Sequence, residues 1–166
     1  MKLRDNYKLV DSAFERLFVK ISRRRQAQER CMNEKMRRLK AFHLLSKISG
    51  REAITITEIC RVAVKSLRES FQNPEFACAR MIIGNREFRT ANYLETQWRN
   101  TAPVIVNDTV IGNIETGYIY ERPGGEDIES MAGELSFLKE ISEHLTLILR
   151  RTAAEKEVSQ QLEEYQ

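Results

Sequence analysis

The chain has 166 residues, of which 42% are hydrophobic, enough for one domain with a core and a helical extension besides. No stretch approaches the roughly 20 apolar residues of a membrane-spanning helix, and the charged N-terminus lacks the apolar run of a signal peptide, so a soluble, cytoplasmic protein is expected. The net charge of +3 hides an asymmetry, because residues 1–49 carry 14 Lys and Arg against 5 Asp and Glu and the rest of the chain is net acidic.

The cysteines bear on redox compartment and metal binding. Cys31, Cys60 and Cys78 are odd in number and widely spaced, which favours neither a disulfide framework nor a CxxC metal site. We expect a reducing compartment, unreactive thiols and no bound metal.

The first 49 residues have the pattern of a helical arm. Apolar residues alternate at spacings of four and three, the a/d pattern of a helix that pairs with a partner. These expected dimer residues are Leu3, Tyr7, Val10, Phe14, Leu17 and Ile21. A polar stretch at 22–30 interrupts the pattern, which then resumes and ends at Gly50, so one long helix and two successive helices both fit.

The middle of the chain predicts one core helix and a sheet. A helix is expected over 58–71, capped by Thr57 and ended by Asn73-Pro74. Two hairpins follow. The strands 76–83 and 86–90 join at Gly84-Asn85, and the strands 98–106 and 109–120 join at Asn107-Asp108. They predict at least four antiparallel strands.

A second long helix is expected from about 131 to 166. Its first part has apolar residues on one side, whereas its polar tail would need a weak coiled-coil seam with another chain. We assign Leu145 and Ile148 to the dimer helices as well. The predicted organisation is a basic arm (1–49), a domain (50–151) and a C-terminal helical extension (152–166).

Alternation sorts the strands into two faces. The expected core face holds Ala77, Ala79, Met81, Ile83, Phe88, Trp98, Ala102, Val104, Val106, Val110, Ile114, Thr116, Tyr118 and Tyr120. The opposite face is polar and lacks an apolar lining for a large ligand, unless the loop 90–97 folds over it with Tyr93 and Leu94. Arg80 and Glu115 there fit a solvated cross-strand pair or a small polar site. The candidate ligand residues are Cys78, Arg80, Tyr93, Arg99, Asn113 and Glu115.

The order helix, hairpin, hairpin, helix resembles the GAF domain, and more narrowly the short GAF-like modules of bacterial and archaeal sensor histidine kinases. The resemblance covers 54–151 and rests on the segments PEFACARMIIGNREFRT, LETQW and APVIVNDTVIGNIETGYIY. The residues that carry it are Pro74, Glu75, Arg80, Glu95, Thr96, Trp98, Gly112 and Tyr120.

The resemblance implies an α+β, profilin-like antiparallel sheet packed on helices, with flanking helices that continue into neighbouring modules. It implies a homodimer that relays a conformational change to a PAS- or kinase-type module of the same chain. Larger GAF domains bind nucleotides, tetrapyrroles or haem in a pocket built from the segment between the second and third strands. Here that segment is only 90–97, so we expect no cofactor, with haem or another small ligand as the minor alternative.

No catalytic motif is present, so no enzymatic activity is expected in this chain, although its parent protein could be a histidine kinase. His144 lacks the acidic residue that follows a phosphoacceptor histidine, and His43 is expected to be structural. The basic arm admits an alternative, a dimeric DNA-binding regulator, although we expect neither nucleic acid nor membrane as a direct partner.

Overall fold

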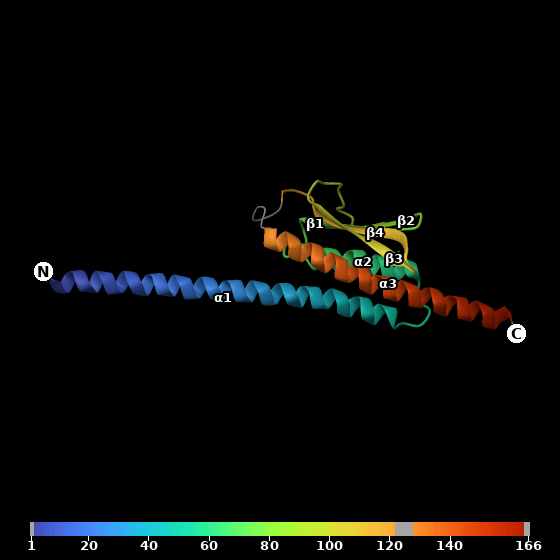
Figure 1. Ribbon diagram of the computed structural model, residues 1–166, viewed down its shortest axis with the longest axis horizontal. Helices are drawn as coiled ribbons and strands as arrows, with labels where there is room; N and C mark the ends of the chain where they lie inside the picture. The colour runs from blue at the N-terminus through green and yellow to red at the C-terminus, as the bar shows by residue number, and fades with distance from the viewer. Residues whose placement is uncertain (1, 122–127, 165–166) are drawn as a thin grey trace. The chain divides into compact units, whose positions relative to one another are not determined.

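The computed structural model describes residues 2–121 and 128–164, with side chains described for 12–121, 131–161 and 163. It shows an α+β protein with three helices and a four-stranded antiparallel sheet among these residues. Helices α2 and α3 cover one face of the sheet, as Figure 1 shows. The expected fold class is confirmed by these elements. None of the described helices is long and apolar enough to cross a membrane.

Helix α1 is continuous from Lys2–Ser49, which decides between one helix and two. The chain divides into two compact units, Met1–Met36 and Arg37–Gln166. The last turns of α1 belong to the second unit because Ala41, Leu45 and Ile48 are buried in its core. The second compact unit therefore begins within α1, at Arg37.

Helix α2 (Ile56–Glu69) begins with a capping box. The Thr55 hydroxyl oxygen accepts a hydrogen bond from the Glu58 backbone N–H at 3.2 Å, and the Glu58 carboxylate accepts one from the Thr55 N–H at 3.0 Å. This reciprocal pair satisfies two donors that a helix start leaves open. The cap is thus Thr55 and not Thr57, since only Thr55 has a glutamate three residues later.

The sheet consists of β1 (Ala77–Ile83), β2 (Arg86–Arg89), β3 (Arg99–Val106) and β4 (Thr109–Tyr118), in the order β2-β1-β4-β3. Both predicted hairpins are confirmed. Gly84 has a φ of 59°, and Asn107 and Asp108 have φ values of 49° and 60°, which are the left-handed conformations that tight hairpin turns require.

A β-bulge shifts the register between β3 and β4. Val104 is opposite Gly112, but Ile105 is opposite Val110, so Ile111 is an extra residue. Ile111 therefore packs against the core, while Val110 is 63% exposed. The placement of Val110 in the core was wrong because strict alternation does not continue through a bulge.

Helix α3 (Ile128–Glu164) supplies much of the core. Leu145 is fully buried and Ile148 is 7% exposed, both against residues of the same chain. Their assignment to a dimer surface was wrong, because they belong to the stripe of α3 that packs on the sheet. Tyr120, expected in the core, lies beyond the end of β4 and is exposed.

Candidate functional site

The loop 90–97 folds over the polar face of the sheet, on the side away from α2 and α3. Three of its residues form hydrogen bonds with strand backbones. Asn92 Nδ2 donates to the Ala77 carbonyl at 2.8 Å, Thr96 Oγ1 donates to the Tyr118 carbonyl at 2.9 Å, and the Thr90 N–H donates to the Ala79 carbonyl at 2.9 Å. The loop is thus a lid fixed to both β1 and β4.

The centre of the covered surface is Glu115, which is 6% exposed. Arg80 is its cross-strand partner and donates to Glu115 Oε2 from Nε at 3.0 Å, with Nη2 at 2.8 Å from the same oxygen. From the lid, the Tyr93 hydroxyl donates to Oε2 at 2.8 Å. Every hydrogen bond that the described residues make to this carboxylate ends on Oε2, which leaves Oε1 available as an acceptor.

Tyr93 also covers the arginine, because the Arg80 guanidinium carbon lies 4.8 Å from the centre of the Tyr93 ring. This geometry is a cation–π contact on a partly desolvated cation. Burial and the Glu115 carboxylate raise the pKa of the Tyr93 hydroxyl to about 12. Burial alone would lower the pKa of Arg80, but the hydrogen bond and charge of Glu115 outweigh it and raise that pKa. Arg80 therefore stays a cation and Tyr93 a neutral phenol at neutral pH.

Cys78 lies beneath the lid. Its Sγ is 3.8 Å from the Leu94 carbonyl oxygen and the residue is buried. Burial raises the pKa of the Cys78 thiol, with a smaller opposite effect from that hydrogen bond. Burial likewise raises the pKa of Cys60 to about 11. Both thiols stay protonated at neutral pH, which makes them poor nucleophiles. Cys31 is exposed on α1.

The remaining candidates are at the margin of this cluster. Arg99 is held by Glu95 of the lid at 2.7 Å, and this hydrogen bond lowers the pKa of the Glu95 carboxyl. Asn113 lies opposite Ile82, on the same face as Glu115. The structure thus brings Cys78, Arg80, Tyr93 and Glu115 together under or within the lid, with Arg99 bound to the lid through Glu95. Asn113 shares the face of β4 with Glu115 but has no described contact with the lid.

Sequence reasoning missed two members of the site. Glu87, on β2, lies 3.9 Å from Arg80 as a second carboxylate. Asn92 places its Oδ1 in a buried position where no described group donates to it. An unmet buried acceptor costs about 1–3 kcal/mol. The alternation of β2 could have indicated Glu87, but nothing in the pattern of the loop distinguishes Asn92 from a solvated residue.

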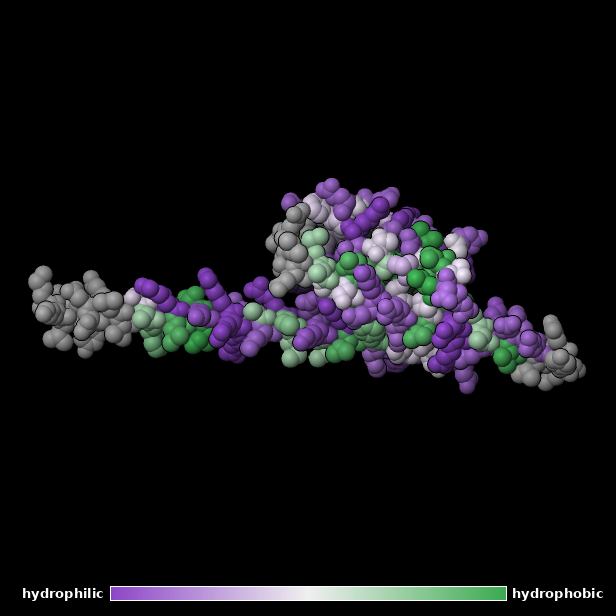
Figure 2. Space-filling model, viewed as in Figure 1, coloured by the Kyte–Doolittle hydropathy of each residue, from purple (hydrophilic) through white to green (hydrophobic). Residues whose placement is uncertain are grey.

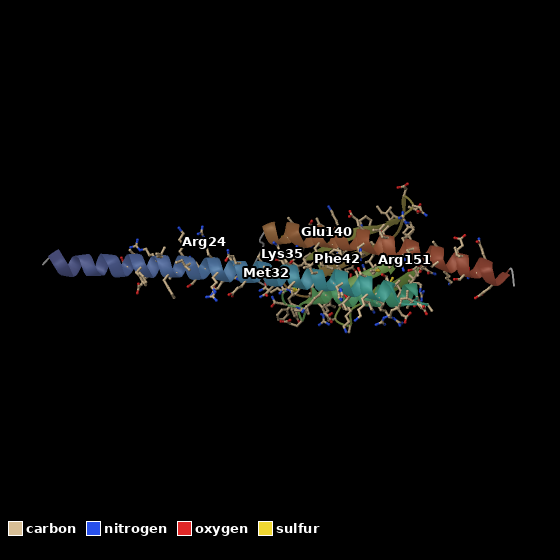
Figure 3. The ribbon with its side chains drawn as sticks, turned by 90° about the horizontal axis from the view of Figure 1, so that it is seen from below. Arg24, Met32, Lys35, Phe42, Glu140 and Arg151 are labelled. Carbon is tan, nitrogen blue, oxygen red and sulfur yellow. The ribbon has the colours of Figure 1, made fainter. Side chains whose placement is uncertain are left out.

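The site offers hydrogen-bonding groups of both charges. Among the described residues, no group of three or more His, Cys, Asp and Glu is placed to hold a metal ion. His144 is a packing residue, whose Nε2 is 3.1 Å from Ser46 Oγ and whose ring meets Phe42 edge-on at 5.5 Å. Figure 3 shows Phe42 between α1 and α3.

A second feature is an exposed apolar stripe on α1. The pairs Phe14 and Met32, Phe18 and Met36, and Ile21 and Leu39 are each 18 residues apart, which is five turns of an α-helix. All six are more than half exposed in the chain described, and Leu17 lies among them. Figure 2 shows such hydrophobic side chains on α1 between hydrophilic ones. The side chains of Leu3, Tyr7 and Val10 lie outside the described side chains.

No protein-family model matches the chain, and no curated protein matches it. Among solved structures, the chain is similar to the crystal structure of the A. aeolicus nlh2 GAF domain in an inactive state. The two are 16% identical, the match covers 72% of this chain and 99% of that chain, and the TM-score is 0.49.

Proposed function

We propose that this chain is a GAF-like sensory or signal-relay module that acts as a homodimer through its long helices. The observation that carries the proposal is the apolar stripe of α1. Large apolar side chains recur on one face over residues 14–39, whereas a helix that works alone would present polar groups there. In this proposal the lid binds the signal, and the long helices transmit the resulting change.

The stripe is distinct from the surface that α1 uses within its own chain. Ala41 and Leu45 face the core, whereas Leu39 is 62% exposed on the other side of the helix. The last turns of α1 therefore bury one apolar side in the core and still expose Leu39 on the side of the stripe. A second copy of the same helix is the occupant that fits, because an identical stripe supplies matching apolar positions at the same spacing.

The proposed input is the Arg80–Glu115–Tyr93 cluster. A small polar ligand with a hydrogen-bond donor could bind Glu115 in place of the Tyr93 hydroxyl, which would move the lid. The lid is joined to the Tyr118 carbonyl through Thr96, and the Tyr118 hydroxyl donates to Glu134 on α3 at 2.8 Å. Tyr118 of β4 is thus hydrogen-bonded both to the lid and to α3.

The proposed output is a shift of α3. Ser142 of α3 also donates to the Pro103 carbonyl on β3, so the helix is tied to two strands. We further propose that α3 passes its movement to a PAS- or kinase-type module of the same protein, as in the sensor histidine kinases that the sequence resembles. The chain itself contributes no catalytic residue in this proposal.

Light scattering tests the dimer directly. We expect the wild-type chain to have twice the mass of one chain and Ile21→Glu to shift it to a single chain, because a buried glutamate in the seam is unpaired. Val19→Glu is the matched control, since Val19 is also exposed and β-branched but lies on the opposite side of α1. A wild-type monomer at high concentration, or equal masses for the two variants, would refute the dimer through this stripe.

The alternative function is DNA binding by the arm, which one observation favours. Arg16, Lys20 and Arg23 line a side of α1 away from the apolar stripe and would stay outside in a helix pair. A mobility shift that weakens steeply as salt rises would support this alternative. A shift that is insensitive to salt, or no shift, would count against it.

A further inference from the structure

A groove of about 610 Å³ runs along α2 and the edge of the sheet. Its lining includes Glu87 and the first lid residues, Thr90 and Ala91, but not Arg80, Tyr93 or Glu115. Its residues span α2 from Thr57 to Glu69 and include all of β2. Val64 and Phe88 contribute apolar surface to it, and both belong to or pack against the core. The base of the groove between α2 and β2 is therefore apolar and continuous with the core.

The groove is strongly basic. It is lined by Arg61, Lys65 and Arg68 from α2 and by Arg86 and Arg89 from β2, against the carboxylates of Glu69 and Glu87.

The two carboxylates are already engaged. Lys65 lies 3.8 Å from Glu69, and Glu87 lies between Arg89 at 4.0 Å and Arg80 at 3.9 Å. Within the described part of the chain, Arg61 and Arg86 have no carboxylate at ion-pair distance. The groove thus has cationic charge in excess of what its own residues neutralise, which favours an anionic occupant.

The strand that borders the groove has an unpaired edge. β2 is the terminal strand in the order β2-β1-β4-β3, so one row of its backbone N–H and C=O groups has no neighbouring strand in the sheet. These groups are a template for the main chain of an extended peptide, which can add as a further strand. A small free anion, in contrast, would not form this row of backbone hydrogen bonds with β2.

The spacing of the helix cations fits such a peptide. Arg61, Lys65 and Arg68 follow the i, i+4, i+7 pattern and lie on one face of α2, separated along the axis by about 6 Å and about 4.5 Å. Side chains on one face of an extended strand repeat every 6.6–6.8 Å or so. Acidic residues at two alternate positions of an added strand could therefore meet Arg61 and Lys65, which are about 6 Å apart along the helix.

We propose that this groove binds an extended acidic peptide segment of a partner protein, with carboxylates at alternate positions, by adding it to the β2 edge. The backbone of β2 would align the peptide, and the cations of α2 would select for acidic side chains. This site goes beyond the sensory role proposed above and does not depend on the chain being a dimer.

The test uses a fluorescein-labelled eight-residue peptide of alternating Glu and Thr, followed by fluorescence anisotropy with the full chain. We expect saturable binding that Arg61→Glu/Lys65→Glu weakens at least about tenfold. Arg23→Glu/Arg24→Glu is the matched control, because it makes the same charge change on α1, and we expect it to alter the affinity less than about twofold. Circular dichroism of each variant checks that it is folded.

Two further reagents separate strand addition from simple charge attraction. Two N-methylated versions of the same peptide are prepared, one methylated at every Glu amide and the other at every Thr amide. The version whose methylated amides face β2 should bind at least about tenfold more weakly than the parent peptide, and the other version should lose little affinity. Each of three results would overturn the proposal: equal affinity of the two N-methylated peptides, equal weakening by Arg23→Glu/Arg24→Glu, or no binding of the parent peptide. Tighter, groove-dependent binding of a single-stranded oligonucleotide would overturn it in favour of nucleic acid.

Discussion

Glu115 shows how much a single buried carboxylate depends on its neighbours. Its Oε2 accepts from Arg80 and Tyr93, and it lies on the face of the sheet opposite the hydrophobic core. A buried ion pair of this kind adds little net stability, because desolvation offsets most of the attraction. Its value is geometric, since the pair fixes where Tyr93 and the lid lie. A ligand that competes for Glu115 would therefore act on Tyr93 and, through it, on the lid.

Tyr93 gives the first prediction at the residue scale. Its pKa of about 12 lies above the ordinary value of 10.0, so the neutral phenol is the form that the fold stabilises. The stabilisation is complete below about pH 10 and is lost as the pH rises toward about 12, because the phenol then ionises beside Glu115. In an absorbance titration, the wild-type chain should show one more late-ionising phenol than Tyr93→Phe.

Circular dichroism recorded through the same titration is the control, because unfolding would release every phenol at once. The prediction is contradicted if the phenol that Tyr93→Phe lacks ionises near pH 10 while the chain is still folded. That result would mean that the hydroxyl is not bound to Glu115 in solution.

At the scale of elements, the close pairing of β1 and β4 depends on a residue with no side chain. A Cβ at Gly112 would lie 1.8 Å from the Ile82 carbonyl oxygen, which is backbone and has little freedom to move. We expect Gly112→Ala to lower the free energy of unfolding by roughly 3–5 kcal/mol or to prevent folding, because the two strands would have to separate. The denaturant midpoint measures this loss.

Gly50→Ala is the matched control. A Cβ there would meet only the Ser46 and Lys47 carbonyl oxygens, at 3.7 Å and 3.8 Å, and we expect a change of less than about 1 kcal/mol. Equal midpoints for the two variants would show that β1 and β4 have room at this position. An insoluble Gly112→Ala chain beside a soluble Gly50→Ala chain would agree with the prediction.

These elements also show which features a sequence can predict. The hairpin turns and the pairing of Arg80 with Glu115 follow from alternation and from residues that accept positive φ, and the structure confirms both. The bulge could not be predicted, because Val110 and Ile111 are both apolar and either could face the core. Nor could the closed lid be derived, since its anchoring depends on Asn92 reaching a carbonyl 15 residues away.

At the scale of the whole molecule, each compact unit has a different source of stability. The second unit has a core from the sheet and three helices, whereas the first unit, Met1–Met36, consists of part of α1 alone. A helix without tertiary packing is stabilised mainly by its backbone hydrogen bonds, which barely offset the entropy of ordering the backbone. We therefore expect a partner on the apolar stripe to increase the helicity of the arm.

This difference predicts two signals that separate on dilution. As the proposed dimer dissociates, the helical circular dichroism signal should fall because the arm loses its partner. The emission of Trp98 should stay constant, since this tryptophan packs against the cluster of Phe71, Ala77 and Tyr118 in the second unit. Ile21→Glu should show the lower helical signal at every concentration, and Val19→Glu should follow the wild-type chain. A helical signal that stays constant while light scattering records single chains would mean that the arm is stable alone, and the apolar stripe would then need a different explanation from pairing.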